Sequence, residues 1–171
     1  AIGKPTGTRV PPIGLGFDRD AHRPDAGAAA ALATLAPKHL RVELRLDRGS
    51  WNETLATAQE SARAVGAALE ISLHLLEEHE PLLETLAGAL AAGPPVERVL
   101  VLNADSRTSS STETTRAALV DTVRAALAGP ASDAAFIGGT EIYFTELNRT
   151  RPQLETWDGV CYSISPQIHA F

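Results

Sequence analysis

Side chains able to transfer protons follow several short apolar runs of the sequence. The residues expected to act in catalysis are Glu146, His74 and Asp105. Those expected to bind the polar groups of a ligand are Arg45, Asn103, Asn148, Tyr162 and His169. Carboxylates and imidazoles serve as general acids and bases, and mixed donors and acceptors suit a molecule with many hydroxyls. These residue types indicate a sugar-like ligand without identifying it.

The short apolar runs alternate with amphipathic or alanine-rich stretches, which is typical of repeated βα units. Strands are predicted at residues 13–17, 40–46, 69–75, 96–102, 134–138 and 160–164. Helices are predicted after Asp25, after Ser50, and around residues 82–90 and 119–127, whereas residues 140–152 are expected to be irregular. Ser50 followed by Glu53 is a capping-box pattern for the second helix. The fold class is α/β.

The second and third predicted strands alternate polar and apolar residues. Their polar faces hold Arg41, Glu43 and Arg45 in one strand and Glu70, Ser72 and His74 in the next. Strands of an open parallel sheet are covered by helices on both faces and normally show continuous apolar runs. The alternation therefore favours a (β/α)8 TIM barrel, with a polar interior and a helix-covered exterior, over a doubly wound sheet.

A complete barrel of this type needs about 250 residues, whereas this sequence has 171. We expect residues 13–171 to form the N-terminal part of a TIM barrel, incomplete in this chain and holding about strands 1 to 6. Residues 1–12 are rich in Gly, Pro and Thr and are interpreted as a linker or the end of a preceding domain. Unpaired barrel edges would favour homo-oligomers.

Composition argues against several classes of partner. The net charge is −6 and no stretch is concentrated in basic residues, so nucleic acid is not an expected partner. The apolar runs are too short to span a bilayer, and the first residues lack a signal pattern. We expect no membrane association and a cytoplasmic location.

Cofactor motifs are also missing from the sequence. Cys161 is the single cysteine, which excludes an internal disulfide and every CxxC motif. Gly14 and Gly16 do not continue into a GxGxxG pattern, and Gly138-Gly139 lacks the Lys-Ser/Thr of a phosphate loop. No cofactor is expected. A divalent metal ion is left open, because His, Asp and Glu occur at several strand ends without HxH or HExxH spacing.

Two stretches near the end of the sequence carry a family resemblance. They are residues 138–152 (GGTEIYFTELNRTRP) and 160–171 (VCYSISPQIHAF). Together they resemble D-apionate lactonase proteins, whose glycoside-hydrolase-like TIM-barrel domain is flanked by other domains. The resemblance implies hydrolysis of a branched-pentose-derived, apionolactone-like lactone to its aldonic acid. It assigns no catalytic residue in this sequence.

Lactone opening requires water activated by a general base or a metal, together with donors for the oxyanion that develops. Glu146 and His74 are the predicted bases, and His169 is a third. The predicted ligands of the oxyanion or of substrate hydroxyls are Arg45, Asn103 and Asn148. The predicted activity is therefore a carbohydrate-active hydrolase.

A glycoside hydrolase is the alternative enzyme. Glycosidic cleavage requires two carboxyl groups about 5 Å apart when retaining, or about 6.5 to 9.5 Å when inverting. Asp105 and Glu146 could each supply one of them. The large retaining clan of sugar-cleaving barrels usually ends its fourth strand with Asn-Glu, but this sequence has Asn103-Ala104-Asp105. That departure disfavours ordinary glycosidase chemistry.

The same residues also have structural interpretations. Arg41, Glu43 and Arg45 could form an internal ion-pair ladder. His74 could be a hydrogen-bonded interior residue, and Glu146 could cap a local element. A non-catalytic sugar-binding barrel is the remaining hypothesis, and it predicts that binding tolerates Glu146→Gln.

Overall fold

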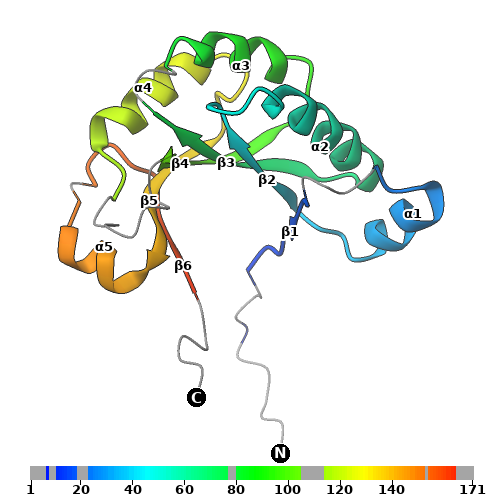
Figure 1. Ribbon diagram of the computed structural model, residues 1–171. Coiled ribbons are helices and arrows are strands. Elements are labelled where there is room, and N and C mark those ends of the chain that lie inside the picture. The colour runs from blue at the N-terminus through cyan, green and yellow to red at the C-terminus, as the bar shows by residue number, and fades with distance from the viewer. Residues whose placement is uncertain are drawn as a thin grey trace, which may run out of the picture.

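Figure 1 shows the computed structural model of the chain, in which a curved sheet carries helices along its outer side. The structure describes residues 7, 11–18, 23–76, 80–104, 114–152 and 154–164. The strands are β1 (Leu15–Gly16), β2 (His39–Arg45), β3 (Ala68–Leu75), β4 (Val96–Asn103), β5 (Ala135–Tyr143) and β6 (Gly159–Ser163). The helices are α1 (Ala26–Thr34), α2 (Trp51–Val65), α3 (Leu82–Leu90), α4 (Ala117–Leu127) and α5 (Phe144–Thr150).

The order of the strands decides the type of α/β fold. The sheet runs β1-β2-β3-β4-β5-β6, and each strand pairs in parallel with the next. A doubly wound sheet reverses its order at a switch point, but this sheet keeps one direction. Right-handed crossovers in one direction place successive helices on the same face, and α1 to α4 follow the convex side in Figure 1. The prediction of an incomplete TIM barrel is confirmed: the described strands form a curled half-barrel.

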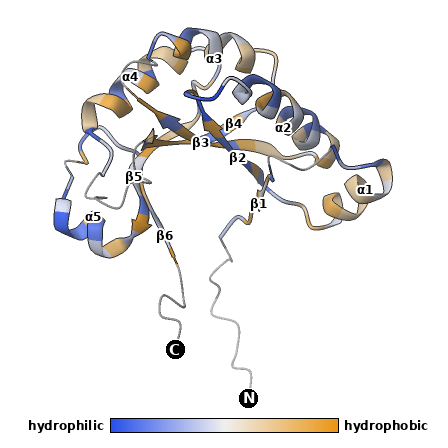
Figure 2. Ribbon diagram, in the orientation of Figure 1, coloured by the Kyte–Doolittle hydropathy of each residue, from blue (hydrophilic) through white to orange (hydrophobic). Residues whose placement is uncertain are grey.

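The two faces of the sheet differ in chemistry. Val42, Leu44 and Leu73 point to the helices and are fully buried in the apolar core. The intervening residues, such as Arg41 and Ser72, lie on the concave face, because successive side chains of a strand alternate between faces. Figure 2 shows this alternation along β2 and β3. The polar interior predicted from the sequence is therefore observed.

Apolar stripes on the helices complete the core on the convex side. In α2 the face made by Leu55, Ala58, Ala62 and Val65 is buried. In α3 the buried residues are Leu83, Leu86 and Leu90, and in α4 they are Leu119, Val120, Val123 and Leu127. Each fully buried leucine of this kind contributes about 1.5–3 kcal/mol of transfer free energy. This layer makes the sheet a rigid support for its concave face.

The ends of α1 and α2 agree with the sequence in part. The Asp25 side chain caps α1 by accepting a 2.7 Å hydrogen bond from the Ala28 N–H. The capping box predicted for α2 is wrong, because Ser50 has φ −94° and ψ 6° and its side chain caps nothing. A capping serine needs an extended backbone to reach the first turn. The Glu53 N–H instead donates to the side chain of Asn52, at 2.9 Å.

Two predictions for residues 134–152 are wrong: the strand does not end at residue 138, and the segment after it is not irregular throughout. β5 continues to Tyr143 and α5 follows directly. Gly138 and Gly139 suggested the end of a strand, but here they permit close packing. A Cβ at Gly138 would lie 2.6 Å from the Trp157 ring, and one at Gly139 would lie 2.0 Å from the carbonyl oxygen of Cys161. The glycines make room for neighbouring groups while the strand continues.

The first strand is shorter than predicted, since only Leu15 and Gly16 pair with β2. Flanking hydrogen bonds extend the contact: Lys38 N–H donates to Ile13 at 2.9 Å, and Phe17 N–H donates to Arg41 at 2.7 Å. β1 is therefore a short edge element.

Two predicted site residues, Asp105 and His169, lie outside the described residues. The same holds for the Ser/Thr-rich segment 106–112 and for most of residues 1–12. Within the part of the chain that the structure describes, no helix combines the length and apolar character needed to cross a bilayer.

Candidate active site

A cleft of about 440 Å³ opens on the concave face of the sheet. It is lined by Arg41, Leu102, Thr140, Glu141, Cys161, Tyr162, Ser163 and Ile164. Most of these residues belong to the C-terminal halves of β4, β5 and β6 or follow β6 directly. Barrel enzymes place their chemistry at the C-terminal ends of their strands. This cleft is therefore the candidate active site.

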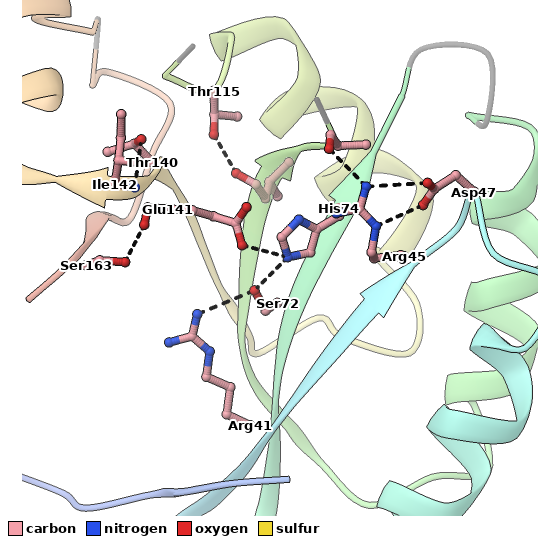
Figure 3. A network of polar contacts seen from close by, with 12 residues as sticks. Arg41, Arg45, Asp47, Ser72, His74, Thr115, Thr140, Glu141, Ile142 and Ser163 are labelled. Carbon is pink, nitrogen blue, oxygen red and sulfur yellow. Dashed lines mark hydrogen bonds and ion pairs between the residues drawn. The ribbon is translucent and has the colours of Figure 1, made fainter. Parts of the chain in front are cut away.

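The side chains of His74 and Glu141 are in contact beside the cleft (Figure 3), with 3.3 Å between His74 Nε2 and Glu141 Oε1. The His74 side chain is fully buried, whereas that of Glu141 keeps 24% of its surface exposed. The hydroxyl of Ser72 lies 3.4 Å from the same ring nitrogen. Glu141 is thus the member of the pair that reaches solvent, and His74 contacts its carboxylate from the buried side.

An irregularity in β5 brings Glu141 to this position. The register between β5 and β6 shifts between Gly139 and Tyr143. Inside the shifted segment, the Ile142 N–H donates to the Thr140 hydroxyl at 3.2 Å. The Ser163 hydroxyl of β6 donates to the backbone carbonyl of Glu141. A bulge of this kind redirects side chains and is common beside active sites.

Arg41 provides a cation at the same cleft. Its side chain is 51% exposed, and Nη2 donates to the Ser72 hydroxyl at 3.4 Å. Its Nε lies 3.9 Å from Glu70, which is a long contact. The guanidinium is therefore accessible and only weakly held, so it can turn its remaining donors toward an anionic group in the cleft.

Arg45, a predicted ligand-binding residue, lies beside His74 in the sheet register. Its Nη2 donates to the carbonyl oxygen of Ala104 at 3.0 Å, and its Nε lies 3.3 Å from Asp47. Burial alone would raise the pKa of Asp47, but the hydrogen bond and charge of Arg45, aided by Arg48, hold it below its usual value. Within the described residues Arg45 links two βα loops, and its role toward a ligand stays a prediction.

Glu146 and Asn148, predicted within an irregular segment, instead lie on α5. Glu146 forms an ion pair with Arg149, three residues later on the same helix, and keeps 18% of its side chain exposed. Asn148 is exposed. Neither lines the cleft among the described residues. Their catalytic and binding roles stay predictions, and the observed contact gives Glu146 a structural partner.

Asn103 and Tyr162 lie nearer to the cleft. Asn103 ends β4, and its amide donates to the carbonyl oxygen of Thr114 at 3.4 Å. Tyr162 lines the cleft, and its ring packs against that of Phe144 with centroids 5.4 Å apart. Tyr162 can therefore contact a ligand directly, whereas the described contact of Asn103 is with Thr114, just before α4, and its role toward a ligand stays a prediction.

Cys161 lines the cleft but is poorly suited to be a nucleophile. Burial raises the pKa of its thiol to about 11, and the opposing charge of Arg41 does not offset this. The thiolate is the nucleophilic form of cysteine. The neutral thiol therefore dominates near pH 7. Cys161 lines the cleft without supplying a nucleophile.

A second polar group occupies the N-terminal end of the concave face. The Glu70 carboxylate lies 2.8 Å from Arg98 Nε and 3.5 Å from His39 Nε2. Glu97 lies 3.3 Å from Arg98 and 3.6 Å from His39. These four residues, hereafter the basal network, pair mainly with one another.

Glu141 and Arg41 are site residues that the predicted catalytic and binding sets lack. Glu141 was expected just beyond the fifth strand, in an irregular segment. Had that strand been extended past Gly139, its period of two would have placed Glu141 on the concave face. Arg41 was predicted on the polar face of the second strand, but its place beside residues of β5 and β6 follows only from the folded sheet.

Among the described residues, no group of three or more His, Cys, Asp or Glu side chains is arranged to hold a metal ion.

The sequential parallel sheet, the outer helices and the polar cleft at the strand ends define a TIM-barrel domain of the kind that carries enzymes. Residues 13–171 match a family model described as the TIM barrel domain of D-apionate lactonase. The chain belongs to this family. A search of curated proteins found no match. Family membership supports a lactonase-type, sugar-related hydrolase domain.

Proposed function

We propose that this domain hydrolyses the lactone of a sugar acid in the cleft lined by Arg41, Glu141 and Tyr162. The observation that carries the proposal is the contact between Glu141 and His74, in which a partly exposed carboxylate is backed by a fully buried imidazole. Such a pair can take up a proton at the edge of a cleft.

In the proposed reaction, the Glu141–His74 pair removes a proton from water as the water oxygen bonds to the lactone carbonyl carbon. Glu141 faces the cleft, and the His74 ring orients its carboxylate. The carbon–oxygen bond of the ring then breaks, and the ring oxygen receives the proton and becomes a hydroxyl. The product is the open-chain aldonic acid, whose carboxyl group then releases a proton to the solvent and becomes the aldonate.

Arg41 is the proposed stabiliser of the oxyanion. A guanidinium can hydrogen-bond the negative charge that develops on the carbonyl oxygen. The 51% exposure of Arg41 and its long contact with Glu70 support this role. Arg45 is more deeply buried and hydrogen-bonds Ala104 and Asp47, so we assign it to positioning the loops.

The proposed substrate is a small branched lactone such as apionolactone. The family description supports this class of substrate. A volume of about 440 Å³ lies within the usual range for small-ligand sites, about 300–1,000 Å³. The polar lining from Arg41, Glu141 and Ser163 suits the hydroxyls of such a ring.

A pH-stat assay on the full-length protein tests the proposal, using a panel of aldonolactones that includes apionolactone, with and without chelator. We expect turnover selective for the branched lactone, and a strong loss in His74→Ala. Glu146→Gln decides between the two carboxylates: if it abolishes turnover while Glu141→Gln does not, Glu146 is the base. Saturable lactone binding without turnover would instead identify a sugar-binding barrel.

The glycosidase alternative has less support from the cleft. It requires two carboxyl groups around one bond, and Glu141 is the only carboxylate among the described lining residues. Release of reducing sugar from aryl glycosides, without lactone turnover, would favour that alternative and direct attention to Asp105.

A further inference from the structure

Thr115 lies between β4 and β5 at the point where these strands stop pairing. The ladder between them ends with Val101 opposite Gly138, although β4 continues to Asn103 and β5 to Tyr143. Thr115 comes from the segment just before α4 and is 3% exposed. Its backbone N–H donates to the carbonyl oxygen of Gly139 at 2.9 Å.

The Thr115 hydroxyl completes the connection. Its oxygen lies 2.6 Å from the Val101 carbonyl oxygen and 3.0 Å from that of Gly139, and it accepts the Gly139 N–H at 3.2 Å. One side chain therefore contacts backbone groups of both strands at the point where their ladder ends. Valine has nearly the same shape but can make none of these bonds.

This arrangement sets the path of β5 toward the cleft. Thr115 holds Gly139 from the β4 side, while the backbone of Cys161 lies so close on the β6 side that only glycine fits at 139. The register shift begins at Gly139, and Glu141 follows two residues later. Glu141 then meets His74, which belongs to β3, across the width of β4.

We infer that Thr115 is a positioning residue, which holds the β5 bulge so that the Glu141 carboxylate reaches His74. This inference rests on the proposed function for its catalytic consequence, but its structural part can be tested separately. Thr115 does not line the cleft among the described residues, so it acts through Glu141 and not on the substrate.

The experiment compares Thr115→Val with Thr115→Ser in the full-length protein. The first readout is the ring nitrogen chemical shifts of His74 as a function of pH, assigned with His74→Gln. Arg45 and Leu102 flank His74 in the register, and Ser72 and Glu141 contact its ring. None of these residues is changed in the variants, so an altered shift reports a change in how the groups around the ring, Glu141 among them, are placed. The second readout is kcat and KM for the lactone.

We expect Thr115→Val to move the His74 shifts and to lower kcat by about ten- to a hundredfold with little change in KM, since a displacement of about 1 Å can cost that much. Thr115→Ser should restore both readouts. Two controls match the change: Thr122→Val removes an exposed threonine hydrogen bond within α4, and Val123→Ala removes buried apolar volume from the same helix. Both should leave the His74 shifts and kcat near wild type.

His74 shifts in Thr115→Val that superimpose on wild type overturn the inference, whatever happens to the rate. Failure of Thr115→Ser to restore the shifts also overturns it. Altered shifts with an unchanged kcat would uphold the positioning role and show instead that Glu141 is not the base. If Thr115→Val does not fold, Thr115→Ala takes its place under the same criteria.

Discussion

The two ends of the concave face use the same residue types for different purposes. At the N-terminal end, Glu70 and Glu97 pair with Arg98 and His39 in the basal network. At the C-terminal end, Glu141 meets a buried histidine and still faces a cleft. In each place a carboxylate contacts an imidazole, so the kind of residue does not distinguish structure from chemistry.

The difference lies in what remains accessible at each end. Glu70 is 8% exposed and has two arginines and a histidine around it, which satisfy its charge inside the sheet. Glu141 keeps about a quarter of its side chain open to the cleft. A charge satisfied by neighbours stabilises the fold, whereas a charge held at the edge of a cleft can act on a ligand.

The largest expected effect is on the rate. Glu141→Gln removes the proposed base, so kcat/KM for the lactone should fall by about 10²- to 10⁴-fold. The matched change in the basal network, Glu97→Gln, should leave kcat/KM within about twofold, because the residue lies away from the reacting groups. Steady-state kinetics by pH-stat measures both. Equal losses of kcat/KM in Glu141→Gln and Glu97→Gln would contradict the proposed difference between the two ends of the concave face.

The cleft also holds a thiol that should be unreactive. Burial raises the pKa of Cys161 from 9.0 to about 11, so near pH 8 the folded protein holds about a hundredfold less thiolate than the unfolded chain. Reaction with Ellman's reagent should be slower in the folded protein by about that factor. Equal rates in buffer and in urea would contradict this.

The same pKa shift has a consequence for stability. A pKa raised by folding gives stability that is fully present below pH 9 and is lost as the pH rises toward about 11. Urea unfolding between pH 8 and 11 should show this loss. Cys161→Ala should lack that part of the pH dependence.

A smaller effect is expected when the basal network is broken. Glu70→Gln leaves Arg98 without its nearest carboxylate and should lower the free energy of unfolding by about 2 kcal/mol. This is below the full cost of breaking a buried pair, because the Arg98 side chain is 28% exposed. Urea denaturation measures the change, and kcat should remain near wild type. A loss of activity with unchanged stability would assign Glu70 to the site.

The smallest expected effect concerns Asp158, which lies outside both ends of the concave face. The Phe136 N–H donates to its carboxylate at 2.7 Å, and Arg124 lies 3.0 Å away. The Phe136 hydrogen bond and the Arg124 contacts hold the pKa of Asp158 below 3.8, although burial opposes them. Its contribution to stability is therefore present above about pH 4 and lost as the pH falls through the folded pKa.

Asp158→Asn should remove that acid dependence and cost about 1 kcal/mol at neutral pH, since the pair is partly exposed. Urea unfolding from pH 2 to 6 compares the variant with wild type. An identical pH dependence in the two proteins would exclude this role for Asp158.

Much of the fold was predictable because it depends on local patterns. The alternation in β2 and β3 correctly separated a helix-covered face from a polar one, and Asp25 correctly marked a helix start. The site was predicted less well. Gly138 and Gly139 indicated a break where the strand continues, because the groups that need their small size lie in Trp157 and Cys161, farther along the chain.

The sequence by itself determined the order of the six strands and of α1 to α4, the polar side of the sheet and the place of His74 on it, because each depends on spacing within a few residues. Only the tertiary structure decided that Glu141 is the carboxylate that meets His74, with Arg41 beside the same cleft. These residues come from β5, β3 and β2, and their meeting depends on the curvature of the sheet and on the bulge held by Thr115. Neither feature leaves a periodic pattern in the sequence, since both arise from packing between residues distant along the chain.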